Sequence, residues 1–154
     1  MSPVPMNDSS PILEIKNLKT YFFLEKSTVR ALDGINLTLN RKTTLGLVGE
    51  SGCGKSIMAM SVMRLIQSPP GKIVDGEINL HRKGGQEVVD LVKLEQYGAE
   101  MRDIRGREIA MVFQEPMTSL NPLYTIGDQI AEAVQAHRNV GRKEALVRAL
   151  VMLH

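Results

Sequence analysis

The pattern of apolar and polar positions changes character several times along the chain. From Ile12 to Asn40, short alternating or β-branched runs are separated by Asn17, by Asp33-Gly34 and by Asn40-Arg41. Alternation with a period of two is typical of strands that bury one face. This stretch therefore predicts antiparallel strands and hairpins. Residues 1–11 are polar and rich in proline and serine, and are expected to form a disordered tail.

The next stretch predicts a buried strand followed by a buried helix. TTLGLVG, residues 43–49, is apolar on both faces, as a strand inside a parallel sheet is. IMAMSVMRLIQ, residues 57–67, is apolar almost all round and is stopped by SPPG, which indicates a helix packed against a sheet. Its side chains Met58, Met60, Met63 and Leu65 are expected to be ordinary core residues.

The remaining sequence alternates between strand and helix patterns. IVDGEINLHR and EVVDLVKL predict strands on either side of an exposed turn at Lys83-Gly84-Gly85, and IAMVF predicts another apolar strand. EQYGAEMRDIRG predicts a polar helix, and RKEALVRALVMLH predicts a helix with Leu146, Ala149, Leu150 and Leu153 at helical spacing. This order of elements predicts an α/β fold.

Composition narrows the class of protein. The 154 residues form one ordinary domain by size, and 19 Lys plus Arg against 17 Asp plus Glu give a charge of only +2, with no basic cluster. Nothing therefore indicates nucleic acid as a partner. The single cysteine, Cys53, excludes an internal disulfide and fits a reducing compartment. We find neither a signal-peptide pattern nor a span-length apolar run, so we expect a cytoplasmic chain.

The sequence GESGCGKS carries the candidate chemistry. It fills every fixed position of the Walker A pattern G-x-x-x-x-G-K-[ST], and it lies between a predicted strand and a predicted helix, as that motif requires. The candidate nucleotide-binding residues are Gly49, Glu50, Ser51, Gly52, Cys53, Gly54, Lys55 and Ser56. A glycine-rich turn that binds nothing is the alternative explanation, and the strand and helix on either side disfavour it.

This loop predicts a nucleoside triphosphate with magnesium as the ligand. Glycines let successive backbone N–H groups point inward, and the helix N-terminus adds a positive end toward phosphate. Lys55 is expected to reach the β- and γ-phosphates, and the Ser56 hydroxyl to bind Mg²⁺. A small P-loop kinase is a weaker alternative, because residues 12–42 place β-rich sequence before the loop.

A second stretch narrows the type of P-loop protein. LVGESGCGKS, RDIRGREIAMVFQEPMTSLNP and TIGDQIAEA together resemble the ATP-binding subunits of ABC transporters, and within them the dipeptide and oligopeptide importers. The resemblance runs from about Ile12 to the end of the chain. The stretch FQEPMTSLNP is typical of a narrow group of proteins and carries most of the subgroup assignment. The Walker A element, by contrast, is shared by a very wide superfamily.

The resemblance implies further site residues and a fold. Gln114 would be the glutamine of the Q-loop, which touches Mg²⁺ and the attacking water. An aromatic residue of the early strands would stack on adenine, with Phe22 as first choice and Tyr21 as the alternative. For both aromatics, ordinary packing in the β layer is an equally good explanation. The implied fold is an α/β P-loop core with an antiparallel β layer from Ile12 to Asn40 and the start of a helical subdomain after about Asn121.

The resemblance also implies partners and a boundary. Transmembrane permease subunits, a second ATP-binding subunit and, indirectly, a solute-binding protein would be partners, and the chain would lie peripherally on the inner face of the membrane. Residues 12–154 correspond to the N-terminal part of one ATP-binding domain, since the sequence contains no LSGGQ signature, Walker B strand or switch histidine. We therefore expect either an importer ATPase subunit represented by its N-terminal portion or a truncated nucleotide-binding module without hydrolysis.

Overall fold

The computed structural model describes residues 10–113 and 120–153 of the chain. Two compact units divide it, Met1–Met101 and Arg102–His154, and each is described by itself. The first unit contains the sheet and the phosphate-loop sequence, and the second contains a helical pair.

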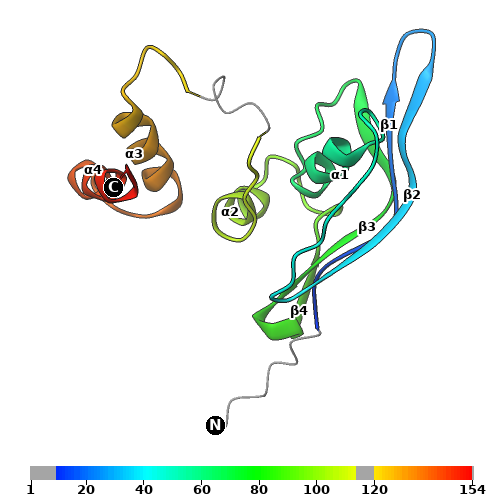
Figure 1. Cartoon of the computed structure of the whole chain (residues 1–154), viewed down its shortest axis with the longest axis horizontal. Coiled ribbons are helices and arrows are strands. Elements are labelled where there is room, and N and C mark those ends of the chain that lie inside the picture. The colour runs from blue at the N-terminus through cyan, green and yellow to red at the C-terminus, as the bar shows by residue number, and fades with distance from the viewer. Residues whose placement is uncertain (1–9, 114–119, 154) are drawn as a thin grey trace. The chain divides into compact units, whose positions relative to one another are not determined.

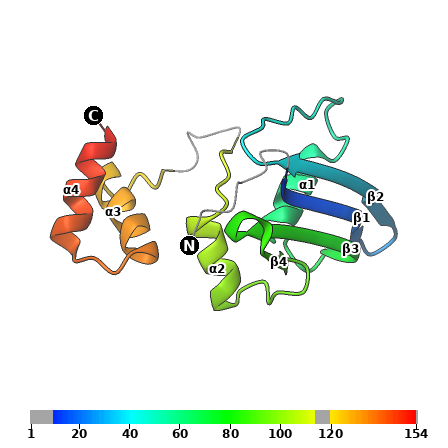
Figure 2. The ribbon, with the colours of Figure 1, turned by 90° about the horizontal axis from the view of Figure 1, so that it is seen from below.

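A four-stranded antiparallel sheet with the order β2-β1-β3-β4 forms the first unit. Figure 2 shows the strands side by side in this order. The strands are β1 (Pro11–Phe23), β2 (Thr28–Asn40), β3 (Gly71–Arg82) and β4 (Glu87–Asp90). The antiparallel β layer predicted from Ile12 to Asn40 is thus confirmed, and the next two predicted strands join the same sheet.

The predicted breaks inside β1 and β2 are bulges rather than turns. Asn17 has φ 49° and Gly34 has φ 84°, and the β1–β2 register shifts between Ile15 and Leu18. The Asn17 backbone N–H donates to Asn36 Oδ1 at 2.9 Å, which ties the two irregular sites together. Pairing with β1 resumes beyond the bulge. The predicted break at Asp33-Gly34 is therefore an irregularity within β2 and not the end of a strand.

Helix α1 (Lys55–Val62) lies beside the sheet (Figure 1). The apolar core of the unit is built from residues of the helix, of the turn that follows it and of β1 and β3. Its members include Met58, Val62, Met63, Ile66, Ile15, Leu18, Ile78 and Leu80. Met58 and Met63 are core residues as predicted, whereas Met60 and Leu65 are only half-buried.

A buried pair of hydroxyl groups joins α1 to strand β1. Thr20 Oγ1 and Ser61 Oγ lie 3.0 Å apart, and both residues are fully buried. The Ser61 hydroxyl also lies 2.7 Å from the Ile57 carbonyl oxygen, to which it can donate. A buried hydroxyl needs a hydrogen-bond partner, so this pair fixes where along β1 the helix can sit.

Two predicted strands are wrong. Residues 43–49 and 109–113 have no regular secondary structure, and Val48 and Val112 are 100% and 93% exposed. Among the residues that the structure describes, no strand pairs with either segment. A parallel strand is stable only between neighbours that satisfy its backbone groups, so apolar composition alone does not produce one here.

Short elements follow β3 along the chain, and the last of them crosses the boundary between the two units. A 3₁₀ turn, η1 (Lys83–Gly85), connects β3 to β4, as the exposed glycine turn predicted. Helix α2 (Ala99–Arg107) begins later than the EQYGAEMRDIRG pattern predicts. The Gly98 N–H donates to the Glu95 carbonyl at 3.0 Å, so a turn takes up the residues before the helix.

The second unit pairs α3 (Ile126–His137) with α4 (Arg142–Leu153). Small residues make the buried contact, namely Ala131, Ala145 and Ala149, and Arg142 forms an ion pair of 2.8 Å with Asp128. The predicted helix at the end of the chain is confirmed, but Leu150 and Leu153 are 60% and 55% exposed. Of the four residues predicted at helical spacing, Ala149 is buried. Ala145, one position before the first of them, is buried as well.

The buried hydroxyl pair generates a test of how α1 is held. Ser61→Ala leaves the buried Thr20 hydroxyl without its partner and should destabilise the fold by about 1–3 kcal/mol, whereas Thr20→Val leaves the Ser61 hydroxyl its bond to the Ile57 carbonyl and should destabilise it less. The double variant should lose less than the sum, with a coupling of about 1 kcal/mol, measured by urea unfolding. Thr38→Val, at an exposed position of β2, is the matched control. A coupling of zero would show that the hydroxyl pair does not anchor the helix.

Candidate functional site

The phosphate-loop sequence connects the exposed segment 43–48 to the first residue of α1. Gly52 and Gly54 have φ 81° and 95°, a region that residues with a Cβ rarely adopt. A Cβ on Gly54 would lie 2.8 Å from the Ala31 carbonyl oxygen and 3.0 Å from Leu32 Cδ2. Gly54 is therefore required both by its conformation and by its close approach to β2.

The loop also closes on itself. A Cβ on Gly49 would lie 2.6 Å from Cys53 Sγ, and the Cys53 N–H donates to the Glu50 carbonyl at 3.4 Å. A side chain at position 49 would therefore require the Cys53 thiol to turn away, while the two backbones would remain in ordinary contact.

The Lys55 ammonium lies against the loop backbone. Its Nζ donates to the Gly49 carbonyl at 2.6 Å, to the Glu50 carbonyl at 2.7 Å and to Cys53 Sγ at 3.2 Å. Three contacts fix the position of a side chain that is otherwise long and flexible. The positive charge is therefore held next to the turn of the loop, at the start of α1.

The N-terminus of α1 is suited to an anion. Gly54 is the N-cap and has no side chain to accept from the first N–H groups, and the first turn contains no acidic residue. These N–H groups and the helix dipole favour negative charge, most strongly phosphate. Ser56 is exposed in the same turn and carries the hydroxyl that a Mg²⁺ ion would require. The residues present thus fit a magnesium-bound phosphate chain.

Cys53 is an exposed thiol of the loop. The hydrogen bond from the Lys55 ammonium, together with the charge of that group, lowers the pKa of the Cys53 thiol. The structure therefore gives this loop position an electrostatic link to Lys55. The sequence had identified Cys53 only as one of the candidate nucleotide-binding residues of the loop.

The two candidate aromatic residues face opposite sides of the sheet. Thr20 faces α1 through its bond to Ser61, and side chains alternate along a strand, which returns Phe22 to the α1 side. A Cβ added to Gly71 would meet both Ile66 Cγ2 at 2.5 Å and Phe22 Cε1 at 2.8 Å, so Phe22 lies on the side of Ile66. Phe22 is half-buried there.

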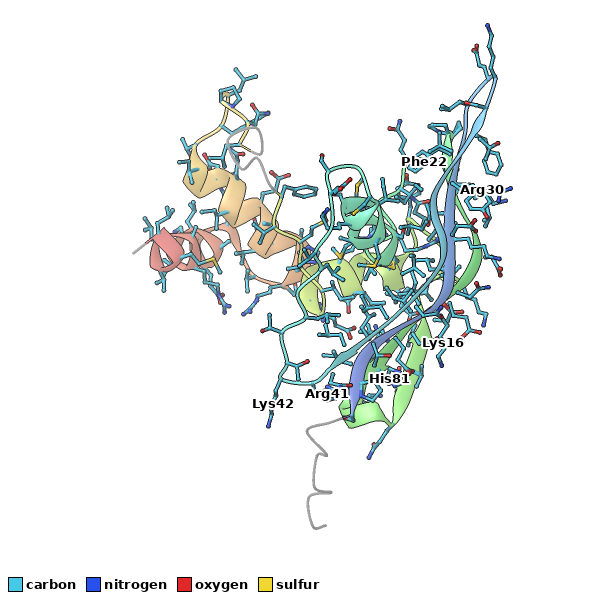
Figure 3. All side chains as sticks on the ribbon, turned by 45° about the vertical axis from the view of Figure 1, so that its right-hand side comes forward. Lys16, Phe22, Arg30, Arg41, Lys42 and His81 are labelled. Carbon is cyan, nitrogen blue, oxygen red and sulfur yellow. The ribbon has the colours of Figure 1, made fainter. Side chains whose placement is uncertain are left out.

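Tyr21 is engaged on the other face. Its hydroxyl donates to Asp33 Oδ1 at 2.7 Å, and this hydrogen bond raises the pKa of the Tyr21 phenol. The Arg30 guanidinium lies 5.6 Å from the centre of the Tyr21 ring, within the range of a cation–π contact. Figure 3 labels Phe22 and Arg30 at the same end of the sheet.

Gln114 lies outside the described residues, so its predicted role has no structural description. The described part of the chain resumes at Leu120. Leu120, Leu123 and Tyr124 are 48%, 85% and 63% exposed. Gln129 of α3 holds this segment, since its Oε1 accepts from the Asn121 N–H at 2.9 Å and its Nε2 donates to the Asn121 carbonyl at 2.9 Å.

The sequence did not predict the residues that position the loop against the sheet. The Ala31 carbonyl and the Leu32 side chain limit what can stand at Gly54, and Thr20 with Ser61 fixes the helix behind it. One signal was present in the sequence, because Ser61 is a polar residue inside an almost wholly apolar helix. Nothing local to the sequence of β2 indicated that its backbone would contact the loop.

Comparison with curated proteins shows extended similarity to peptide transport and import ATP-binding proteins. The chain is 48% identical to the oligopeptide transport ATP-binding protein AppD of Bacillus subtilis, over 94% of this chain and 42% of that protein. It is 46% identical to the probable peptide ABC transporter ATP-binding protein y4tR of Sinorhizobium fredii, over 92% of this chain and 40% of that protein. The chain thus spans about two fifths of the length of these relatives.

Solved structures show the same fold. The dimeric ATP-binding cassette MJ0796 bound to ADP and Pi superposes with a TM-score of 0.71 at 24% identity, covering 90% of this chain and 54% of the cassette. This likeness confirms the predicted fold class, an α/β cassette of which the chain represents about half. The sequence model of the ABC transporter family matches residues 32–152. The chain therefore belongs to the ABC transporter family of ATP-binding proteins.

Proposed function

We propose that this chain is the nucleotide-binding portion of an ABC importer subunit that couples ATP binding and hydrolysis to uptake of peptides or similar small solutes. The observation that carries the proposal is the Lys55 ammonium, held 2.6 and 2.7 Å from two loop carbonyls at the uncapped start of α1. The names of the relatives, which include oligopeptide and peptide transport proteins, support the solute class.

In this proposal the loop binds Mg-ATP through groups that are already in place. The N–H groups of the loop and of the first turn of α1 face the phosphates, and Lys55 neutralises part of their charge. Ser56, with Gln114 from outside the described residues, would bind the magnesium ion. The metal supplies charge neutralisation at the phosphates when it is bound.

Phe22 is the preferred residue for stacking on adenine. It lies on the α1 side of the sheet, as do the helix and loop that would hold the phosphates. Tyr21 faces the other side, and its hydroxyl and ring are already engaged by Asp33 and Arg30. The geometry therefore favours Phe22 over the alternative that the sequence had left open.

Docking to transmembrane permease subunits would use the segment after Gln114. Leu123 and Tyr124 are 85% and 63% exposed, and exposed apolar side chains on a segment held by hydrogen bonds are suited to a protein partner. No helix in the described part of the chain is long and apolar enough to cross a bilayer. We propose a peripheral location on the inner face of the membrane, reached through the permease.

A second ATP-binding subunit is the other proposed partner. The solved cassettes of this fold are described as dimeric. A solute-binding protein would act only indirectly, through the permease. The alternative function is a nucleotide-binding module that never hydrolyses ATP. Sequencing the encoding DNA beyond His154 separates the two, since an in-frame signature motif and Walker B strand would identify the importer subunit.

Lys55→Ala tests the binding half of the proposal. Removing the ammonium should weaken Mg-ATP binding by about ten- to a hundredfold, because a charge-assisted hydrogen bond to phosphate contributes about 1.5–3 kcal/mol. Lys26→Ala, at an exposed position outside the loop, should leave the affinity unchanged. Isothermal titration calorimetry measures the Mg-ATP affinity of the original chain and of both variants. Equal affinities of the original chain and Lys55→Ala would contradict the assignment of the loop as a phosphate-binding site.

Phosphate release from the same proteins tests the other half. Because the sequence contains no signature motif or Walker B carboxylate, the 154-residue chain should release phosphate only at the background rate. Release that depends on Lys55 would show that this chain itself hydrolyses ATP, and would exclude the module without hydrolysis.

Phe22→Ala and Tyr21→Ala form a matched pair for the adenine site. Loss of a stacking ring is expected to weaken Mg-ATP binding by about five- to a hundredfold, corresponding to about 1–3 kcal/mol. Only Phe22→Ala should show this loss, and the affinity for inorganic triphosphate should not change. If Tyr21→Ala loses ATP affinity and Phe22→Ala retains it, the preference derived from the faces of β1 is wrong.

A further inference from the structure

Phe22 belongs to a row of three residues that crosses the sheet. It pairs with Val29 of β2 on one side and with Gly71 of β3 on the other. Directly opposite residues of an antiparallel pair project their side chains from the same face. Phe22 lies on the α1 face of β1, as does Thr20, so Val29 lies on the α1 face as well.

A bulge in β2 brings Val29 to this face. The β1–β2 register shifts between Thr20 and Tyr21, because β2 has one extra residue, Ala31, at this point. Without the extra residue, alternation along β2 from Leu32 would turn Val29 to the opposite face of the sheet. Bulges that redirect a side chain are frequent beside functional sites. The position of Val29 therefore depends on a specific irregularity of the strand.

The Val29 side chain is uncovered, unlike other apolar residues of the same face. Val29 is 47% exposed, whereas Leu18 and Leu32 are 0% and 4% exposed. The Phe22 ring extends toward β3 and away from Val29, since a Cβ on Gly71 would lie 2.8 Å from Phe22 Cε1. An apolar surface made by Val29 and the half-buried Phe22 is thus open to solvent.

Backbone hydrogen bonds hold this surface in place. The Phe23 N–H donates to the Pro70 carbonyl at 2.9 Å, which ties the end of β1 to the turn before β3. The Leu24 N–H donates to the Ser27 carbonyl at 2.9 Å and closes the turn between β1 and β2. A β-branched valine has little rotamer freedom to lose. A ligand therefore meets a surface that is already formed.

The open surface lies near the phosphate loop along β2. The Ala31 carbonyl and the Leu32 side chain are the groups that approach Gly54, the N-cap of α1. Val29 precedes them by two and three residues, about 7–10 Å along a strand. A nucleotide whose phosphates lie at the start of α1 can therefore place its base beside Val29, with the sugar between.

The row offers contact area but no hydrogen-bonding side chain. Val29 and Phe22 are apolar, and Gly71 has no side chain. Such a surface cannot read the polar edge of a base, and stacking alone accepts any base. It distinguishes bases by the area that each covers. The Cβ atoms of opposite residues are about 5 Å apart, so two fused rings cover both Phe22 and Val29, whereas a single ring on Phe22 leaves Val29 bare.

We infer that Val29 is a specificity-determining residue of the nucleotide site, which extends the stacking surface of Phe22 and favours a purine over a pyrimidine base. The inference rests on the proposed function, because it takes Phe22 as the residue that stacks on the base. Burial of the exposed Val29 methyl groups under the second ring supplies the preference. Val29 has no part in binding the phosphates, which belong to the loop and Lys55.

Titration calorimetry of the 154-residue chain with Mg-ATP, Mg-CTP and inorganic triphosphate tests the inference. Val29→Ala should weaken Mg-ATP binding by about threefold to tenfold and Mg-CTP binding by less than about twofold, because only the purine covers the lost methyl groups. The affinity for triphosphate should not change. Val88→Ala is the matched control, since Val88 is 52% exposed on β4, and it should bind all three ligands as the original chain does.

Val29→Ile keeps the apolar surface and should retain the preference for Mg-ATP over Mg-CTP. Equal losses for Mg-ATP and Mg-CTP in Val29→Ala, an unchanged affinity for Mg-ATP, or a loss of triphosphate binding would each overturn the inference. If Lys55→Ala and Phe22→Ala still weaken Mg-ATP binding in that case, the proposed function stands without it. If the original chain does not bind Mg-ATP, the proposed function fails and the inference fails with it.

Discussion

The contact between Gly54 and the backbone of β2 is the constraint on which the site depends. Gly54 has a left-handed conformation, and its Cα lies so close to the Ala31 carbonyl that a Cβ would come within 2.8 Å of the oxygen. The same residue is the N-cap of α1, so its position sets the direction of the helix and of its first N–H groups. The geometry of the proposed phosphate site is thus fixed by the backbone of a neighbouring strand.

The sheet and the helix reinforce this constraint from behind. The Thr20–Ser61 hydroxyl pair fixes α1 along β1, while Met58, Val62 and Met63 bury its inner face. The loop then needs only glycines for close approach and Lys55 to hold its turn, and both are present. An uncapped helix end is unfavourable in isolation, because its N–H groups lack partners. A bound phosphate would supply them, so ligand binding and loop stability are coupled.

The sequence predicted the parts of the molecule whose signals are local. Alternation located the strands from Ile12 to Asn40, and the Walker pattern located the loop and the start of α1. The strand predictions at 43–49 and 109–113 failed because apolar composition reports burial, whereas a strand also requires a neighbour with free backbone groups. The choice between Phe22 and Tyr21 was open because it depends on which face of β1 meets α1. The Thr20–Ser61 bond, between residues forty-one positions apart, shows which face of β1 meets α1, and the preference for Phe22 as the adenine residue is our proposal from that geometry.

The most direct measurement of the central claim is the affinity for Mg-ATP of Gly54→Ala compared with Gly46→Ala. Gly46 has open space around it and lies outside the loop, so alanine there should leave the affinity unchanged. Alanine at Gly54 must adopt an unfavourable φ and displace the Ala31 carbonyl, which should weaken binding by about tenfold or more. Equal affinities of the two variants would contradict the account, because they would show that the contact with β2 does not set the phosphate-binding geometry.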